Sequence, residues 1–187
     1  GSLAHGLDYA DTHTAAICHA SAVVVPTALA LGESLGLDGA TVLTAMVAGY
    51  ETMTRIGMAA PGEFHARGWH ATAVCGTFAA ALAAGKCLGL SRAQLTAALG
   101  IAGSLASGVL EHLEDGSWVK RLHPGWAGHS GALAAGLARG GFTGPATIFE
   151  GRFGLYRTFL GSLPDLSPVT ADLGQRWETL RVAFKPY

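Results

Sequence analysis

Apolar residues recur with helical spacing along most of the first 160 residues of this chain. The segments open at residues that cap helices and close at glycine. Residues 21–35 stop at Gly36, and Asp38 is suited to cap a helix that reaches about Met58. The same pattern predicts further helices over residues 70–88, 91–107, 123–140 and 148–159. Outside them, residues 179–184 resemble a strand, so the sequence predicts an all-α fold with one short strand near the C-terminus.

Two rows of small residues, spaced four apart, run along two of the predicted helices. The rows are Gly100, Ser104 and Gly108, and Gly128, Ala132, Gly136 and Gly140. Residues four apart form the ridges along which helices pack, and small side chains let helix axes approach closely. Glycine inside a helix costs about 1 kcal/mol relative to alanine, so we expect close helix contacts to offset that loss. The pattern favours an orthogonal multi-helix bundle over helices that glycine merely interrupts.

The composition narrows the class of protein. The 187 residues are 50% apolar and 13% charged, with a net charge of −1. This suits one sizeable domain and offers no basic surface, so we expect neither nucleic acid nor a membrane as a partner. The longest uncharged stretch, residues 93–110, holds polar residues and glycines and suits a buried helix better than a membrane span. Three cysteines without a CxxC pair favour a reducing compartment, and we expect a cytoplasmic protein.

Histidines and carboxylates gather near the N-terminus. If residues 8–19 are helical, Asp8, Thr12 and His19 project from the same face. A carboxylate that orients a histidine is a common arrangement for a general base. The alternative is a solvated segment in which Asp and His occur incidentally, since both are ordinary surface residues.

Two further clusters stand at predicted helix starts, where free N–H groups and the helix dipole favour anions. In residues 65–70, Arg67 and His70 add hydrogen-bond donors; in residues 115–126, Lys120, Arg121 and His123 do so. The alternatives are a histidine that caps its helix and a loop that tryptophans attach to the bundle. No HExxH, GxGxxG or GxxxxGK[ST] pattern occurs, and we expect no metal and no cofactor.

Several long motifs resemble the MmgE/PrpD family. They are HGLDYADTH at residues 5–13, HASAVVVP at 19–26, FHARGWHAT at 64–72, DGSWVKRLHPGW at 115–126, FEGRFGLY at 149–156 and FKPY at 184–187. The family includes 2-methylcitrate dehydratase, cis-aconitate decarboxylase and iminodisuccinate epimerase. The resemblance covers essentially the whole chain. Ala10 and Ala20 depart from a frequent aspartate and a frequent proline, but neither is a group that we assign to chemistry.

The resemblance implies an active site for a small polycarboxylate. By it, Asp8, Thr12 and His19 fall on active-site positions of the first motif, as do the residues His70, Lys120 and Lys185 in later motifs. We expect His19, Asp8 and Lys120 to be catalytic. The expected substrate-binding residues are His70, Lys185, Thr12, Arg67 and His123. Lysines and His70 would bind carboxylates while His19 moves a proton, because fixed cations favour a transition state that gathers negative charge.

The resemblance also implies a domain organisation. We expect a helical domain over residues 1–161 and a proline-containing linker that begins a lid domain over residues 162–187, with further helices before Gly1 and the rest of the lid after Tyr187. The expected function is that of a lyase, most simply dehydration of a 2-methylcitrate-type substrate. Decarboxylation, epimerisation and a non-catalytic dimerisation module are the alternatives. Apolar surface left uncovered beside Lys185 leads us to expect a homodimer.

Overall fold

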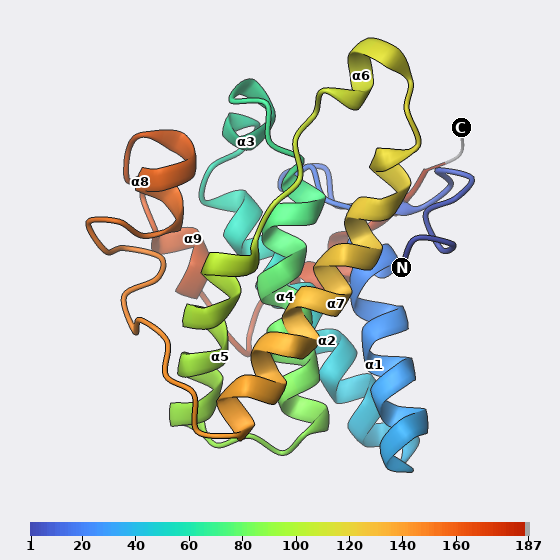
Figure 1. The fold of residues 1–187 in the computed structure, drawn as a ribbon, viewed down its shortest axis with the longest axis vertical. Helices are drawn as coiled ribbons and strands as arrows, with labels where there is room; N and C mark the ends of the chain where they lie inside the picture. Colours follow the sequence, from blue (N-terminus) through green and yellow to red (C-terminus); the bar gives the residue numbers. More distant parts are fainter. Residues whose placement is uncertain (186–187) are drawn as a thin grey trace.

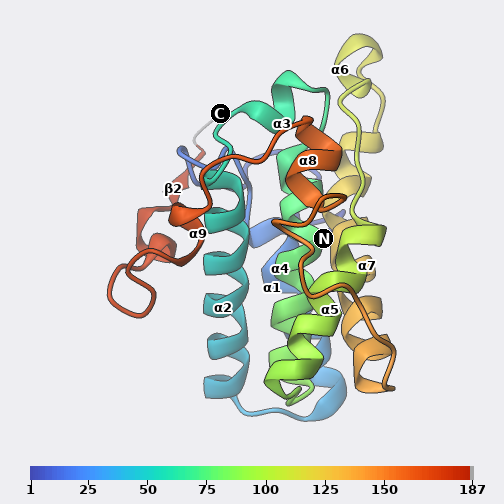
Figure 2. The same cartoon turned by 90° about the vertical axis from the view of Figure 1, so that its left-hand side faces the viewer.

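The computed structural model describes residues 1–185, and its architecture is helical as predicted. Pro186 and Tyr187, the last two positions of the FKPY motif, lie outside the described residues. The long helices run lengthwise through the molecule and share one long direction (Figures 1 and 2). The helical elements are α1 (Ser21–Leu35), α2 (Gly39–Met58), α3 (Glu63–Ala66), α4 (Ala71–Cys87), α5 (Arg92–Leu105), α6 (His112–Asp115), α7 (Val119–Arg139), α8 (Leu155–Leu160), α9 (Ser167–Thr170) and the 3₁₀ turn η1 (Glu178–Arg181).

Local capping explains why several helices begin and end where the sequence predicts. The side chain of Asp38 accepts a hydrogen bond from the backbone N–H of Thr41 at 2.8 Å, before α2. Ser91 and Gln94 form a capping box at the start of α5. Gly36 and Gly89 follow α1 and α4 with φ angles of 62° and 66°, a left-handed conformation that glycine adopts without a side-chain clash.

Helix α4 forms the centre of the core, and α1, α2, α5 and α7 pack around it (Figures 1 and 2). It is rich in alanine and buried along nearly its whole length. A side chain at Gly131 of α7 would place its Cβ 2.4 Å from the Cβ of Ala80 and 2.5 Å from the backbone nitrogen of Ala81. Small residues therefore let α7 and α4 approach closely.

The two predicted rows of small residues do not form the close contact between α7 and α4. Gly131 is outside both rows. Within them, Gly136 has open space where a side chain would stand, whereas Gly128 faces Thr27 of α1. Gly100 does make a close approach, but to the backbone of Gly144 and Pro145, a loop rather than a helix.

Four local predictions are corrected. Residues 8–19 are not helical: Asp8 and Ile17 have φ angles of 59° and 52°, which break a helix. Helix α7 begins at Val119, four residues before the predicted start, and contains Pro124 in its second turn. Between residues 148 and 159, helix forms only from Leu155 onward. The predicted strand over 179–184 is mostly the turn η1, followed by the two-residue strand β2 (Ala183–Phe184).

Strand β2 connects the two ends of the chain. It pairs antiparallel with β1 (Asp11–Thr12), with Asp11 opposite Phe184 and Thr12 opposite Ala183. The C-terminal strand therefore lies against the N-terminal loop, as Figure 1 shows for the red and dark-blue segments. This pairing carries Lys185 to the segment that holds the first predicted cluster.

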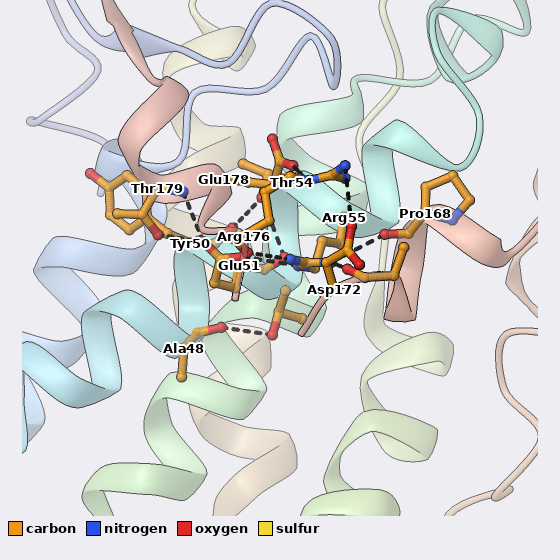
Figure 3. Close-up of polar contacts among 12 residues, drawn as sticks. Ala48, Tyr50, Glu51, Thr54, Arg55, Pro168, Asp172, Arg176, Glu178 and Thr179 are labelled. Atoms are coloured by element: carbon orange, nitrogen blue, oxygen red, sulfur yellow. Dashed lines mark hydrogen bonds and ion pairs between the residues drawn. The ribbon is translucent and has the colours of Figure 1, made fainter. Parts of the chain in front are cut away.

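The segment after α8 is attached to α2 by a buried polar network (Figure 3). Arg55 donates to Glu51 at 2.9 Å and to the carbonyl oxygens of Ala171 and Arg176 at 2.7 and 2.8 Å. The other oxygen of Glu51 accepts from the backbone and hydroxyl groups of Thr179 at 2.8 and 2.7 Å. The predicted linker is thus packed on the helical core, and a domain boundary at residue 161 stays a prediction.

Candidate active site

Two lysines converge on one carboxylate. Lys120 in the first turn of α7 and Lys185 after β2 donate to the same oxygen of Asp8, at 2.8 and 2.9 Å. The ring nitrogen Nε2 of His5 lies 3.3 Å from the other oxygen. Burial works to raise the pKa of Asp8, but the hydrogen bonds and charges of both lysines outweigh it and hold that pKa well below its usual range. Two ammonium groups beside one carboxylate leave a net positive charge at this point.

His19 is oriented by the backbone rather than by Asp8. Its Nδ1 lies 2.6 Å from the carbonyl oxygen of Asp11 and 3.2 Å from the hydroxyl of Thr12. A carbonyl can only accept, so Nδ1 carries the hydrogen and Nε2 of the neutral ring is left free to take a proton. The backbone N–H of His19 donates to Thr72 of α4 at 3.2 Å, which fixes the residue to the core.

Asp11 has a structural role that its sequence motif does not reveal. Its carboxylate accepts from the backbone N–H of Ser21 at 3.0 and 3.2 Å and from the Ser21 hydroxyl. It therefore stands at the N-terminus of α1, where a negative charge is favoured by the helix dipole. The carbonyl oxygen of Asp11 also accepts from the ring of His19, so Asp11 holds both the start of α1 and the histidine.

A histidine cluster stands at the start of α4. The Nδ1 atoms of His70 and His123 are 2.9 Å apart, and both residues are buried. His112 packs edge-on, with ring centroids 6.1 Å from His70 and 5.5 Å from His123. Burial, followed by the nearby positive charges of His123 and His65, holds the pKa of His70 far below its usual range. The ring of His70 is therefore neutral.

The lysine pair and the histidine cluster belong to one region. The rings of His5 and His19 are 5.3 Å apart, and His5 also lies beside Asp8. On the other side, His65 is 6.3 Å from His70 between ring centroids. Charge on His19 also lowers the pKa values of His5, His65 and His70, so His19 interacts electrostatically with both groups. Asp8, His19, His70 and Lys120 come from three segments, the N-terminal loop, the start of α4 and the first turn of α7, and gather at one end of the bundle.

Two other predicted site residues, Thr12 and Arg67, lie in different places. Thr12 lies beside His19, as given above. Arg67 is exposed at the end of α3, and its guanidinium lies 3.3 Å from where a Cβ of Gly161 would stand, at the end of α8. The structure thus places the guanidinium of Arg67 beside the end of α8. His5 and His112 are buried, with 1% and 5% of their surface exposed, and neither was predicted as a site residue, because nothing local to either residue predicts its burial.

His5 is buried strongly enough to change its chemistry. Burial, followed by the positive charge of His19, lowers its pKa to about 4, although Asp8 works in the opposite direction. A neutral His5 leaves the two lysines as the cations next to Asp8.

Within residues 1–185, no group of three histidine, cysteine, aspartate or glutamate side chains is arranged to hold a metal ion. The same part of the chain contains no helix that is both long and apolar enough to cross a bilayer. Cys18, Cys75 and Cys87 are free and buried. The absence of a metal and a cofactor stays a prediction.

The fold and site define an all-α domain that gathers lysines, histidines and a carboxylate at one end of a helix bundle. Residues 1–165 match the family described as the MmgE/PrpD N-terminal domain. The chain belongs to the MmgE/PrpD family, as its motifs predict.

Named relatives show the same similarity over nearly the whole chain. Cis-aconitate decarboxylase-like protein oryM of Aspergillus oryzae is 35% identical over 199 residues, covering 99% of this chain and 41% of the relative. Cis-aconitate decarboxylase of Aspergillus terreus is 35% identical over 189 residues, covering 95% and 38%. The human cis-aconitate decarboxylase is 31% identical over 192 residues, covering 100% and 39%. The chain therefore spans about two fifths of the length of these relatives.

Proposed function

We propose that this chain forms the helical part of the active site of a lyase that decarboxylates a small polycarboxylate of the cis-aconitate type. The observation that carries the proposal is the convergence of Lys120 and Lys185 on one oxygen of Asp8, beside His19. Such a pair of ammonium groups is suited to bind a substrate carboxylate. The names of three relatives support decarboxylation as the reaction.

His19 is the proposed proton carrier. Because the Asp11 carbonyl holds hydrogen on Nδ1, protons are exchanged at Nε2. In a decarboxylation, the bond to the departing CO₂ leaves its electron pair on the substrate. A proton delivered from Nε2 of the protonated ring then neutralises the carbon that carries the pair, and solvent returns a proton to the histidine. The lysines would stabilise negative charge as it spreads onto a remaining carboxylate.

Dehydration of a 2-methylcitrate-type substrate is the second candidate. The same Nε2 would remove a proton next to a carboxylate, and a β-hydroxyl would leave. The geometry of His19 serves both directions of proton transfer, so the choice of decarboxylation rests on the similarity to named decarboxylases.

The test uses the full-length protein. It is incubated separately with cis-aconitate and 2-methylcitrate while released CO₂ and the organic product are followed by ¹³C NMR. We expect CO₂ and a five-carbon dicarboxylate from cis-aconitate, and at least a hundredfold loss of turnover in His19→Gln, within the usual range for removing an acid–base group. His129→Gln, an exposed change on α7, is the matched control. Dehydration of 2-methylcitrate without CO₂ release would establish the second candidate, and near-normal turnover of His19→Gln would refute the proton-carrier role.

We also propose a homodimer. Large apolar side chains next to the site are exposed, among them Phe184 at 95% and Trp118 at 79%. Exposed apolar side chains favour a partner where they form a contiguous surface. Sedimentation of the full-length protein should give twice the chain mass, and a monomer at micromolar concentration would contradict the dimer. A cytoplasmic location stays a prediction.

A further inference from the structure

The close contact between His70 and His123 restricts where hydrogens can lie. Two bare ring nitrogens would repel each other at 2.9 Å, so one Nδ1 must donate to the other. A neutral imidazole has one hydrogen, on either Nδ1 or Nε2. If both rings are neutral, they are therefore held in opposite tautomers.

Both rings lie where a charge is disfavoured. Burial is the main reason why the pKa of each is lowered, and His112 adds to this for His123. His65 and His19 do the same for His70. In the neutral pair, the ring that donates from Nδ1 keeps Nε2 bare, and its partner carries hydrogen on Nε2.

The loop before α6 holds the pair in place. The backbone N–H of His70 donates to the carbonyl of Gly108 at 2.9 Å, and Leu110 donates to Gly68 at 2.8 Å. Gly108 has φ 115°, and a Cβ there would lie 2.6 Å from the Cβ of Ala73 and 3.5 Å from the His123 ring. Glycine therefore lets this loop close directly over the two histidines.

His112 adds a third fixed ring. Its Nδ1 lies 3.2 Å from the carbonyl oxygen of Val109, which can only accept. Nδ1 of His112 therefore carries hydrogen, and its Nε2 is a buried atom without a hydrogen-bond partner within residues 1–185. In this cluster the backbone therefore fixes the tautomer of His112, while His70 and His123 fix each other's tautomers.

We propose that His123 is a positioning residue that donates from Nδ1 to Nδ1 of His70 and so holds His70 as the Nε2–H tautomer, a neutral donor for a substrate carboxylate. The direction of this hydrogen bond rests on the proposed function. A carboxylate has acceptors alone, so a neutral histidine assists its binding only if the ring nitrogen presented to it carries hydrogen. The opposite direction would leave a bare Nε2, which would repel the carboxylate.

The tautomer can be measured directly by ¹⁵N NMR on full-length protein with labelled histidine, with His70→Gln used to assign the His70 signals. We expect Nε2–H in the unmodified protein. His123→Leu should populate the Nδ1–H form and raise KM for the tricarboxylate about tenfold, as expected for one lost hydrogen bond, with a smaller change in kcat. His123→Asn keeps an N–H donor near the same place and should restore both. His129→Leu, on the exposed side of α7, is the matched control.

Hydrogen on Nδ1 of His70 in the unmodified protein would overturn the proposal, as would an unchanged His70 tautomer in His123→Leu. If His123→Leu does not fold, the spectra of the unmodified protein and His123→Asn decide the question. A His70 ring with Nε2–H in a protein that does not act on tricarboxylates would support the histidine pair and refute the proposed function. Decarboxylation by a protein that carries hydrogen on Nδ1 of His70 would support the proposed function and refute the proposed role of His123.

Discussion

The amino group of Lys185 lies 2.9 Å from a carboxylate oxygen of Asp8, a residue 177 positions earlier in the sequence. Lys120 reaches the same oxygen from α7. All three side chains are partly exposed, at 22%, 30% and 39% for Lys185, Lys120 and Asp8. A carboxylate from solution can therefore approach the two ammonium groups while Asp8 keeps them in place.

Removing one of these lysines should weaken substrate binding and change the acidity of Asp8. We expect Lys120→Met or Lys185→Met in the full-length protein to raise KM about tenfold, because each loses a charge-assisted hydrogen bond. The pKa of Asp8 should rise toward its ordinary range, so the carboxylate would be protonated at a higher pH than in the unmodified protein. Steady-state kinetics and a ¹³C titration of the Asp8 carboxyl measure the two effects. Lys86→Met, an exposed change near the end of α4, should alter neither; unchanged KM in both site variants would contradict the role of the lysines.

A pair of glycine substitutions on α7 tests how closely this helix packs. Gly131→Ala should lower the free energy of unfolding by about 1–3 kcal/mol, because its Cβ would overlap with Ala80 and the backbone of Ala81. Gly136→Ala on the same helix has open space around it and should be stabilising by about 0.4–1 kcal/mol. Chemical denaturation measures both. Equal effects of the two changes would contradict the packing of α7 on α4.

The network in Figure 3 should make Arg55 important for stability. Its side chain is 3% exposed, and Glu51 beside it is 9% exposed. Arg55→Met should lower the free energy of unfolding by about 3–5 kcal/mol, because Glu51 would stay buried without its cation. The double variant with Glu51→Gln should lose less than the sum of the two single variants. Arg92→Met, exposed at the start of α5, is the control; additive losses would show that the pair is not coupled.

Glu178 should make stability depend on pH in the acid range. Burial works to raise its pKa, but the hydrogen bond from His13 and the charge of Arg176 outweigh burial and lower that pKa. A carboxyl with a lowered folded-state pKa contributes stability above its unfolded pKa of about 4.3, and this stability is lost as pH falls through the folded-state value.

Glu178→Gln should therefore destabilise the protein at pH 7 by about 1.5–3 kcal/mol, as for hydrogen bonds to a charged group. The difference from the unmodified protein should shrink as the pH is lowered below about 4. Unfolding curves at several pH values measure this. Glu150→Gln, an exposed change, provides the baseline, and a difference that does not vary with pH would contradict the role of the ionised carboxylate.

The parts of the fold that depend on local chemistry could be predicted from the sequence. The bounds of α1, α2 and α5 follow from Gly36, Asp38 and Ser91, which act through neighbours a few residues away. The conformation of residues 8–19 could not be predicted in this way, because β1 forms only by pairing with β2, whose residues lie far along the chain. The early start of α7 could not be predicted, because proline favours the first turn of a helix, whereas Pro124 lies in the second turn, where its missing N–H leaves out one backbone hydrogen bond.

The candidate site could likewise be predicted from the sequence only in part. Family motifs predicted Asp8, His19, His70 and Lys120 as site residues, and that role stays a prediction; the motifs carried no information on which atoms meet. The orientation of His19 by a backbone carbonyl has no side-chain signature, so Asp8 was assigned that task instead. Arg67 lay in a strong motif, yet the loop geometry turns it toward α8.

The pairing of β2 with β1 sets an order of events during synthesis. Translation at about 5–20 residues per second places roughly 10–35 s between the emergence of Asp8 and that of Lys185. During this interval the helices around α4 can already bury their alanines, while the N-terminal loop lacks the strand, Glu178 and the second lysine that later hold it. A chain that ends before Glu178 would thus lack the contacts that hold the N-terminal loop and complete the lysine pair.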